Sequence, residues 1–164
     1  MFGLLAIHFL LKAFILIFRI SLLITLLCSL NVYSGEVVPC LETAMSQRAI
    51  NQCANIDFNK AELELKRVIV EIRDLYKNEK KFIVNLDKSQ KHWAVQLEMD
   101  LDLKYPKADE PMYYGSVFPM CYSAYKTKLT LQRIAFLKGW LKGSVEGEVC
   151  SGSVMNEYYI KNSE

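Results

Sequence analysis

The chain has 164 residues, which is enough for one domain of ordinary size and leaves little room for a second core. Its apolar fraction of 52% is raised by the first 30 residues, which are almost entirely apolar, and the remainder has an ordinary globular composition. Lys12 and Arg19 are the only charged residues before Glu36, so the chain from Glu36 onward has 18 basic and 18 acidic residues. This balance excludes a general electrostatic attraction to nucleic acid or to anionic lipid.

The N-terminal segment is typical of a signal peptide. An uncharged run rich in Leu and Ile follows Arg19, and Val32 and Ser34 stand three residues and one residue before a cleavage point after Ser34. We therefore predict a signal peptide at residues 1–34 and an exported mature protein, periplasmic or secreted. The alternative is an uncleaved membrane anchor, because Lys12 and Arg19 interrupt a longer apolar stretch.

The cysteines predict a disulfide-stabilised domain. Four remain after removal of the signal peptide, namely Cys40, Cys53, Cys121 and Cys150. Their wide spacing, without a CxxC motif, gives little support to a zinc site and favours two disulfides. If the segment between Cys40 and Cys53 is one helix, these two residues are roughly 20 Å apart, too far for a bridge. We therefore favour pairings that join each of them to Cys121 or Cys150.

Helical periodicity dominates the first half of the mature chain. A short helix of about three turns is expected between Thr43 and Cys53. Asp57 follows as the N-cap of a long helix, because apolar residues then recur in steps of four and three residues. These residues are Ala61, Leu65, Val68, Ile72 and Leu75. After a polar run at 77–81, the same period returns at Phe82, Leu86, Gln90, Trp93 and Leu97 and predicts a second long helix.

The second half contains a loop and a last helix. Residues 97–103 alternate between apolar and polar as a half-buried strand would, but we interpret them as a helix end that passes into a loop. Proline and glycine mark this loop at 104–117. A third long helix follows and ends at Gly143, and the tail at 143–164, which carries Cys150, is polar and expected to be loose. The predicted domain at 35–142 is thus an all-α, disulfide-stapled bundle of three main helices plus a short N-terminal helix.

Four stretches in a fixed order carry a resemblance to a known family. They are Cys40–Cys53 with Thr43 and Gln47 inside it, Ala61–Tyr76, Leu86–Trp93 with Gln90 three residues before Trp93, and Gly115–Cys121 followed by Leu129, Thr130 and Arg133. In this order, the segment from Cys40 to Leu137 resembles the LprI-type lysozyme inhibitor domain, a family of small exported helical bacterial proteins. The resemblance implies a non-catalytic function in binding a protein partner, a lysozyme.

One feature departs from the family pattern. After the tryptophan the family usually has an Arg-Asp pair and then a cysteine, whereas Leu97, Glu98 and Leu101 occupy those places here. The resemblance therefore implies that Cys150 replaces the missing cysteine and that one disulfide follows a different route.

The sequence gives little support to catalysis. His8 and His92 are the only histidines, and no nucleophile elbow, P-loop or dinucleotide-binding motif occurs. We interpret His92 as an exposed or edge-packed helix residue. We expect neither catalytic residues nor a metal or other cofactor, and an unrecognised cell-wall hydrolase is the least favoured hypothesis.

Acidic and aromatic residues around the predicted loop form the candidate partner-binding site. The set comprises Glu98, Asp100, Asp102, Asp109, Glu110, Tyr113 and Tyr114. An acidic loop suits the substrate cleft of a lysozyme, which is a strongly basic enzyme, and competitive inhibition then needs no chemistry. The alternative interpretation is an ordinary solvated face. The residues that the family pattern singles out are Gln90, Trp93, Gly115, Thr130 and Arg133, and for these we expect structural roles between helices.

The leading hypothesis is an exported binding protein that inhibits a lysozyme. The alternative is a structural or secretion-accessory module of the cell envelope that docks on another protein and has no lysozyme activity.

Overall fold

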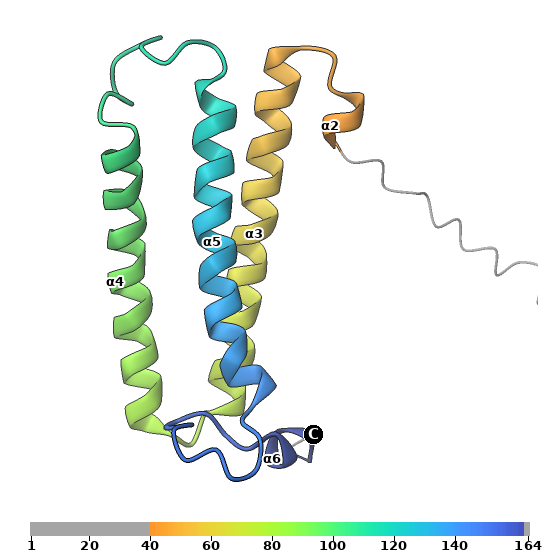
Figure 1. Ribbon diagram of the computed structural model, residues 1–164, viewed down its shortest axis with the longest axis vertical. Coiled ribbons are helices and arrows are strands. Elements are labelled where there is room, and N and C mark those ends of the chain that lie inside the picture. The colour runs from red at the N-terminus through yellow and green to blue at the C-terminus, as the bar shows by residue number, and fades with distance from the viewer. Residues whose placement is uncertain (1–39, 163–164) are drawn as a thin grey trace, which may run out of the picture. The chain divides into compact units, whose positions relative to one another are not determined.

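The computed structural model describes residues 40–162, and the predicted signal peptide and its cleavage point lie outside this range. The described chain forms α2 (Cys40–Thr43), α3 (Gln47–Leu75), α4 (Lys80–Lys104), α5 (Phe118–Lys142) and α6 (Glu157–Lys161) (Figure 1). Within these residues there is no strand, and one isolated bridge joins Ser144 and Asn156. The prediction of an all-helical bundle with three main helices and a short helix in front is confirmed.

Helix α3 is a single helix of 29 residues, whereas the sequence analysis expected two helices separated near Asp57. Its N-cap is Ser46, whose hydroxyl accepts a hydrogen bond from the backbone N–H of Ala49 at 3.2 Å. Asp57 lies inside the helix and forms an ion pair with Lys60. The prediction of a break was wrong because no Pro or Gly occurs between Gln47 and Leu75, so nothing ends the helix at its polar middle.

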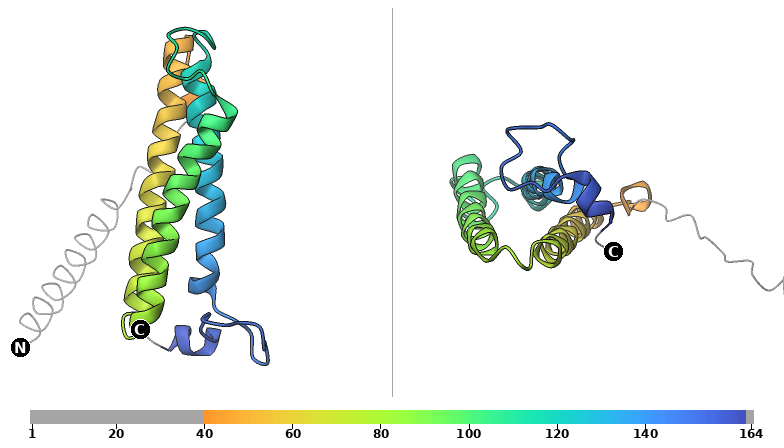
Figure 2. Two further views of the ribbon diagram at one scale, coloured as in Figure 1. Left: turned by 90° about the vertical axis from the view of Figure 1, so that its left-hand side faces the viewer. Right: turned by 90° about the horizontal axis from the view of Figure 1, so that it is seen from below.

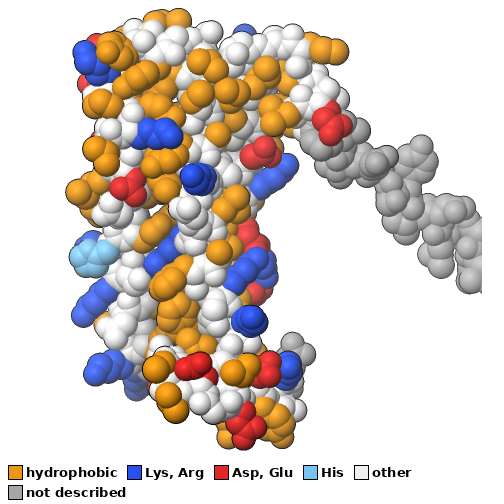
Figure 3. Space-filling model, viewed as in Figure 1, with side chains coloured by type: hydrophobic (Ala, Val, Ile, Leu, Met, Phe, Trp, Pro, Cys, Tyr) orange, Lys and Arg blue, Asp and Glu red, His pale blue; other side chains and the backbone are white. Residues whose placement is uncertain are grey.

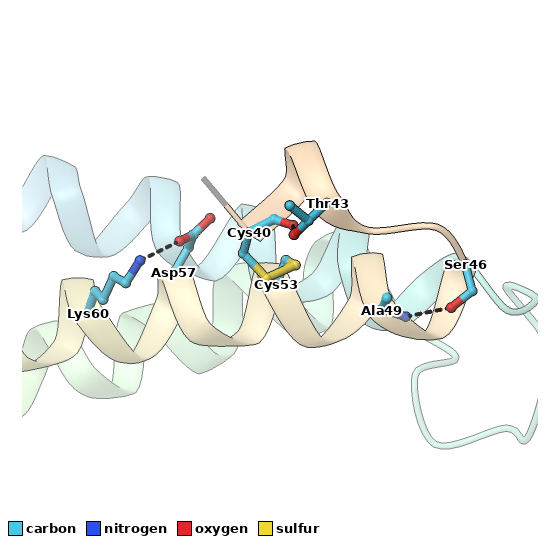
Figure 4. Close-up of a disulfide and its surroundings, with 7 residues drawn as sticks. All are labelled: Cys40, Thr43, Ser46, Ala49, Cys53, Asp57 and Lys60. Carbon is cyan, nitrogen blue, oxygen red and sulfur yellow. Dashed lines mark hydrogen bonds and ion pairs between the residues drawn. A yellow bond between two sulfur atoms is a disulfide. The ribbon is translucent and has the colours of Figure 1, made fainter. Parts of the chain in front are cut away.

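The disulfide joins Cys40 to Cys53, with a Cα–Cα separation of 5.4 Å (Figure 4). The preferred pairing of these residues with Cys121 and Cys150 was therefore wrong. The estimate of roughly 20 Å assumed one continuous helix. Instead, α2 ends at Thr43 and the chain turns at residues 44–46 before α3 begins, so that Cys40 lies beside the second turn of α3.

Cys121 and Cys150 are both unpaired, and Cys150 is exposed. Cys121 lies in the first turn of α5, and Cys150 follows the end of that helix. The rise of α5 between Cys121 and Lys142 is about 30 Å, several times the separation that a disulfide tolerates. These two thiols therefore do not form a second bridge within the chain.

Helix α4 continues through the alternating segment at 97–103, which we had expected to pass into a loop. Leu97 and Leu101 are four residues apart, so a helix buries both of them against the bundle. Met99 and Leu103, which a strand would place on the same face as these leucines, are 58% and 81% exposed. Packing of one helical face thus overrides the local alternation.

The end of α5 and the segment after it pack together at one end of the bundle. Gly143 ends α5 with a φ of 82°, as predicted, and a Cβ at this position would lie 2.8 Å from the backbone of Glu157. The tail is not loose: Ser144 donates its backbone N–H to Met155, and Glu157 donates back to Ser144. The buried Tyr76 hydroxyl fixes this closure, because it donates to the Trp140 carbonyl and accepts from the Met155 N–H.

The three long helices surround one core at their lower end in Figure 1. Its buried members are Leu65, Val68, Ile72, Tyr76, Leu86, Ile134 and Leu137. Seen from below, α3, α4 and α5 lie at the corners of a triangle (Figure 2). Helix α5 packs along the length of α3, while α4 stands further away and reaches the core through larger side chains such as Phe82 and Trp93. In residues 40–162 no helix is both long and apolar enough to cross a membrane.

Candidate functional site

The loop between α4 and α5 rests on a cluster of aromatic rings. Tyr105, directly after α4, contacts the rings of Tyr114, Phe118, Tyr122 and Tyr125 at centroid distances of 5.3 to 6.3 Å. Its hydroxyl donates to the Cys121 carbonyl at 3.3 Å. Burial among these groups raises the pKa of the Tyr105 phenol. The cluster anchors both ends of the loop to α5.

Two further contacts fix the backbone of the loop. The backbone N–H of Lys107 donates to the Tyr114 hydroxyl at 3.4 Å, across the loop. The side-chain amide of Asn51 on α3 donates to the Ser116 carbonyl at 2.9 Å, and Gln47 donates to Asn51 at the same distance. Asn51 could not be identified from the sequence, because a polar residue one turn after Gln47 has no signature beyond that of an exposed helix.

Met112 lies at the tip of the loop in the left-handed region, with a φ of 60°, and its side chain is 74% exposed. A residue other than glycine is uncommon in this conformation. Tyr113 beside it is 54% exposed, and Leu103 at the end of α4 is 81% exposed. Hydrophobic side chains accordingly cover much of the loop end of the domain (Figure 3). The apolar residues Leu103, Met112 and Tyr113 are hereafter called the apolar tip.

The predicted acidic residues do not form one cluster. Glu98 forms an ion pair with Lys126 at 3.3 Å, and Asp100 accepts a hydrogen bond from Gln96 at 2.7 Å on the side of α4 that faces α5. Glu110 pairs with Lys107 at 3.0 Å. That leaves Asp102 and Asp109, which are exposed and without an ion pair in the described part of the chain.

The two lysines near the loop lie against tyrosine rings. The Lys104 ammonium is 3.9 Å from the ring centroid of Tyr125, and that of Lys107 is 4.6 Å from Tyr113. These cation–π contacts hold both side chains on the aromatic cluster. The structure thus brings the rings of Tyr113 and Tyr114 into contact at 4.9 Å, whereas Glu98 and Asp100 lie on α4 with separate partners.

The residues of the family pattern join α4 to α5 in the middle of the bundle. The Arg133 guanidinium donates to Gln90 at 2.6 Å and to Ser89 at 2.7 Å, and its central carbon is 6.0 Å from the ring centroid of Trp93. Burial lowers the pKa of Arg133. One turn earlier on α5, the buried Thr130 hydroxyl donates to the Lys126 carbonyl.

His92 is exposed on α4, and among residues 40–162 no group of three His, Cys, Asp or Glu side chains is placed to hold a metal ion. Gly115, also in the family pattern, has a φ of 74° and forms the turn before α5.

Residues 40–137 match the protein family described as lysozyme inhibitor LprI. No significant match was found among curated proteins or among solved structures. The family match covers more than half of the 164 residues, including the three long helices almost to the end of α5. This chain therefore belongs to the lysozyme inhibitor LprI family.

Proposed function

We propose that this protein inhibits a lysozyme by binding it without catalysis, and that the loop end of the domain contacts the enzyme. The family supports the class of activity. The main support for this binding surface is Met112. Its apolar side chain is exposed, and its backbone adopts the left-handed conformation that is uncommon for residues other than glycine. Such strain persists only where the surrounding structure imposes it, and it concentrates at binding sites.

The structure of the loop suits a protein partner. The apolar tip has the aromatic and methionine content that is enriched at the centres of interfaces. The aromatic cluster beneath it and the bond from Asn51 hold the loop in place, so that little ordering entropy is lost on binding.

The charges near the apolar tip suit a basic enzyme. Asp102 and Asp109 have no internal cation to neutralise them among the described residues, and the nearby ammonium groups of Lys104 and Lys107 lie on tyrosine rings. Carboxylates at the edge of an interface mainly increase the rate of association with a basic partner and make that rate sensitive to salt.

An extracytoplasmic location is consistent with this function. A disulfide such as Cys40–Cys53 persists in oxidising compartments, and the predicted signal peptide would deliver the chain there. Lysozyme acts on the cell wall, so inhibitor and enzyme would meet outside the cytoplasm.

The test is inhibition of a lysozyme on a cell-wall substrate, with the oxidised chain from residue 35 titrated to stoichiometry. We expect saturation at one inhibitor per enzyme and weaker inhibition at raised salt. Met112→Ala should raise the inhibition constant about tenfold or more, since truncation of an interface anchor costs more than 1 kcal/mol. Leu63→Ala, which truncates an exposed apolar side chain on α3, is the control.

A second pair of variants tests the charges. The double variant Asp102→Asn, Asp109→Asn should weaken inhibition and reduce its salt dependence, whereas Asp74→Asn, an exposed carboxylate at the opposite end of α3, should change neither. Absence of inhibition at micromolar excess of the wild-type chain would contradict the proposal and favour a docking module of the cell envelope.

A further inference from the structure

A groove runs between α4 and α5, apart from the loop end. It consists of two adjoining hollows of about 420 and 260 Å³, and Phe136 lines both. Trp140 lines the larger hollow, and Trp93 lines the smaller one. In Figure 3 hydrophobic side chains follow the surface between these two helices, with Lys and Arg side chains on either side. The larger hollow, and the two hollows taken together, lie in the range of sites for small ligands.

One wall of the groove presents aromatic rings that are already fixed in place. Phe136 is 56% exposed, and its ring contacts Trp140 at a centroid distance of 5.1 Å. The indole N–H of Trp140 donates to Ser153 at 3.1 Å, and the guanidinium of Arg133 lies 5.1 Å from the Phe136 ring. Phe136 therefore offers an apolar ring surface to solvent while its neighbours hold it in position.

The rest of the lining is polar and has unused hydrogen-bonding capacity. The amides of Asn85 on α4 and Gln132 on α5 are exposed and make no hydrogen bond within the described chain. Arg133 makes no ion pair there and bonds only to the neutral side chains of Gln90 and Ser89. Asp100 adds a carboxylate at one end, and Lys81 and Glu79 add one charge of each sign at the other.

This combination of an exposed phenylalanine ring, two partly buried tryptophans, free amides and mixed charges suits the chemistry of a sugar. A sugar ring has an apolar face of C–H groups, which packs on an aromatic ring, and a rim of hydroxyl groups, which both donate and accept hydrogen bonds, as amides do. An acyl chain would instead leave the amides of Asn85 and Gln132 covered and unpaired, at a cost in free energy.

We propose that the α4–α5 groove binds a glycan chain, with sugar rings packed on Phe136 and the two tryptophans and with hydroxyl or acetamido groups bonded to Asn85 and Gln132. Because the two hollows adjoin at Phe136, we expect an oligosaccharide rather than a single sugar. This site is independent of the loop end and of the proposed inhibition of lysozyme.

The chain contains its own reporters for a test. Trp93 and Trp140 are its only tryptophans, and both line the groove. Tetrasaccharides of β-1,4-linked N-acetylglucosamine, β-1,4-linked glucose and α-1,4-linked glucose are titrated into the oxidised chain up to millimolar concentration, and tryptophan fluorescence and heat are measured. At least one tetrasaccharide should give a saturable change in both signals.

Variants of the groove locate the binding. Phe136→Ser should weaken it about tenfold, in line with the loss of one stacking contact, whereas Tyr158→Ser, which removes an exposed aromatic ring from α6, should have no effect. Asn85→Leu is a second variant, which removes an amide but keeps the groove apolar, and it should bind a glycan more weakly than the wild type does. Decanoate serves as the acyl-chain probe and should not bind the wild-type chain.

The outcomes decide the proposal. Saturable glycan binding that both groove variants weaken supports it, with helical content checked by circular dichroism. The proposal is overturned if none of the three tetrasaccharides binds, if folded Phe136→Ser or Asn85→Leu binds as tightly as the wild type, or if decanoate binds the wild-type chain in the groove. Lysozyme inhibition by the same variants should remain unchanged, so the two proposals fail separately.

Discussion

Tyr76 connects three segments of the chain through one hydroxyl group. It lies at the end of α3, donates to the last turn of α5 and accepts from the tail at Met155. Tyr76→Phe should lower the free energy of unfolding by about 1 to 2 kcal/mol, because the Met155 N–H and the Trp140 carbonyl lose their partner. Urea denaturation checks this value, with the exposed Tyr158→Phe as a control that should change nothing.

The same hydroxyl predicts a dependence of stability on alkaline pH. The pKa of the Tyr76 phenol is raised above its ordinary value of 10.0 because burial disfavours the phenolate, although the hydrogen bond from Met155 lowers it in part. As pH rises past this ordinary value, the unfolded chain loses the phenolic proton first, so stability is complete below it and falls above it. Tyr76→Phe should show a shallower decline with pH. An identical decline in both proteins would contradict this assignment.

A substitution at Met112 can distinguish the effect of backbone strain on stability from the effect of the side chain on inhibition. Its φ of 60° costs about 1 to 2 kcal/mol for a residue with a side chain, whereas glycine adopts it freely and adds roughly 0.5 to 1 kcal/mol of entropy to the unfolded chain. Met112→Gly should therefore leave stability unchanged or raise it by up to about 1 kcal/mol, while inhibition weakens. Met99→Gly, an exposed site inside α4, should lower stability by about 1 kcal/mol. Equal destabilisation of the two variants in thermal unfolding would argue against strain at the loop.

At the scale of elements, the continuity of α3 has a direct test. Ser46 caps the helix and Asp57 lies within it, which reverses the roles expected from the sequence. Ser46→Ala should lower the free energy of unfolding by about 1 kcal/mol, whereas Asp57→Ala should change it by less than about 0.5 kcal/mol. The opposite ranking would mean that the helix starts at Asp57.

The disulfide fastens α2 to α3. Replacement of Cys40 and Cys53 by serine should lower the free energy of unfolding by roughly 3 kcal/mol, because the bridge closes a short loop in the unfolded chain. Reductant should destabilise the wild type to a similar extent and leave the double variant unaffected. Cys150→Ser is the matched control, since its thiol is exposed and unpaired. If this variant also abolished the response to reductant, the assigned bridge would be wrong.

Much of this architecture could be predicted from local periodicity. The spacing from Leu65 to Ile72 identified the buried face of α3, and Gly143 marked the end of α5 because a left-handed turn there requires glycine. The pairing of Cys40 with Cys53 could not be predicted, because it depends on the change of chain direction at residues 44–46, which contain neither Pro nor Gly. The positive φ of Met112 could not be predicted either, because the residues that impose this backbone conformation are brought together only by the fold.

At the scale of the whole molecule, the equal number of basic and acidic residues from Glu36 onward conceals an uneven distribution along α4. Its first half carries four lysines against Asp87, whereas its second half carries Glu98, Asp100 and Asp102 against Lys104. In Figure 3 Lys and Arg side chains gather at the lower part of α4. The acidic half lies next to the loop, and a role of these carboxylates in binding a partner stays a prediction.

The segment after α5 lies beyond the family match at residue 137 and covers one end of the core. Truncation after Gly143 should lower the free energy of unfolding by roughly 2 to 4 kcal/mol, because it removes the partner of Tyr76 and the packing of Met155. Deletion of residues 162–164 alone is the control. Calorimetric unfolding of the three chains gives the comparison, and equal melting temperatures would show that the tail contributes nothing to the core.

The position of the exposed Cys150 thiol determines how this domain can be attached to another molecule. Cys150 follows the end of α5 and is exposed, whereas the loop with Met112 precedes the start of α5, one helix length away. A chain attached through Cys150 to a support, a dye or a second chain therefore presents its loop outward and unobstructed. Two chains coupled at this position would form a bivalent molecule with a loop at each of two distant ends.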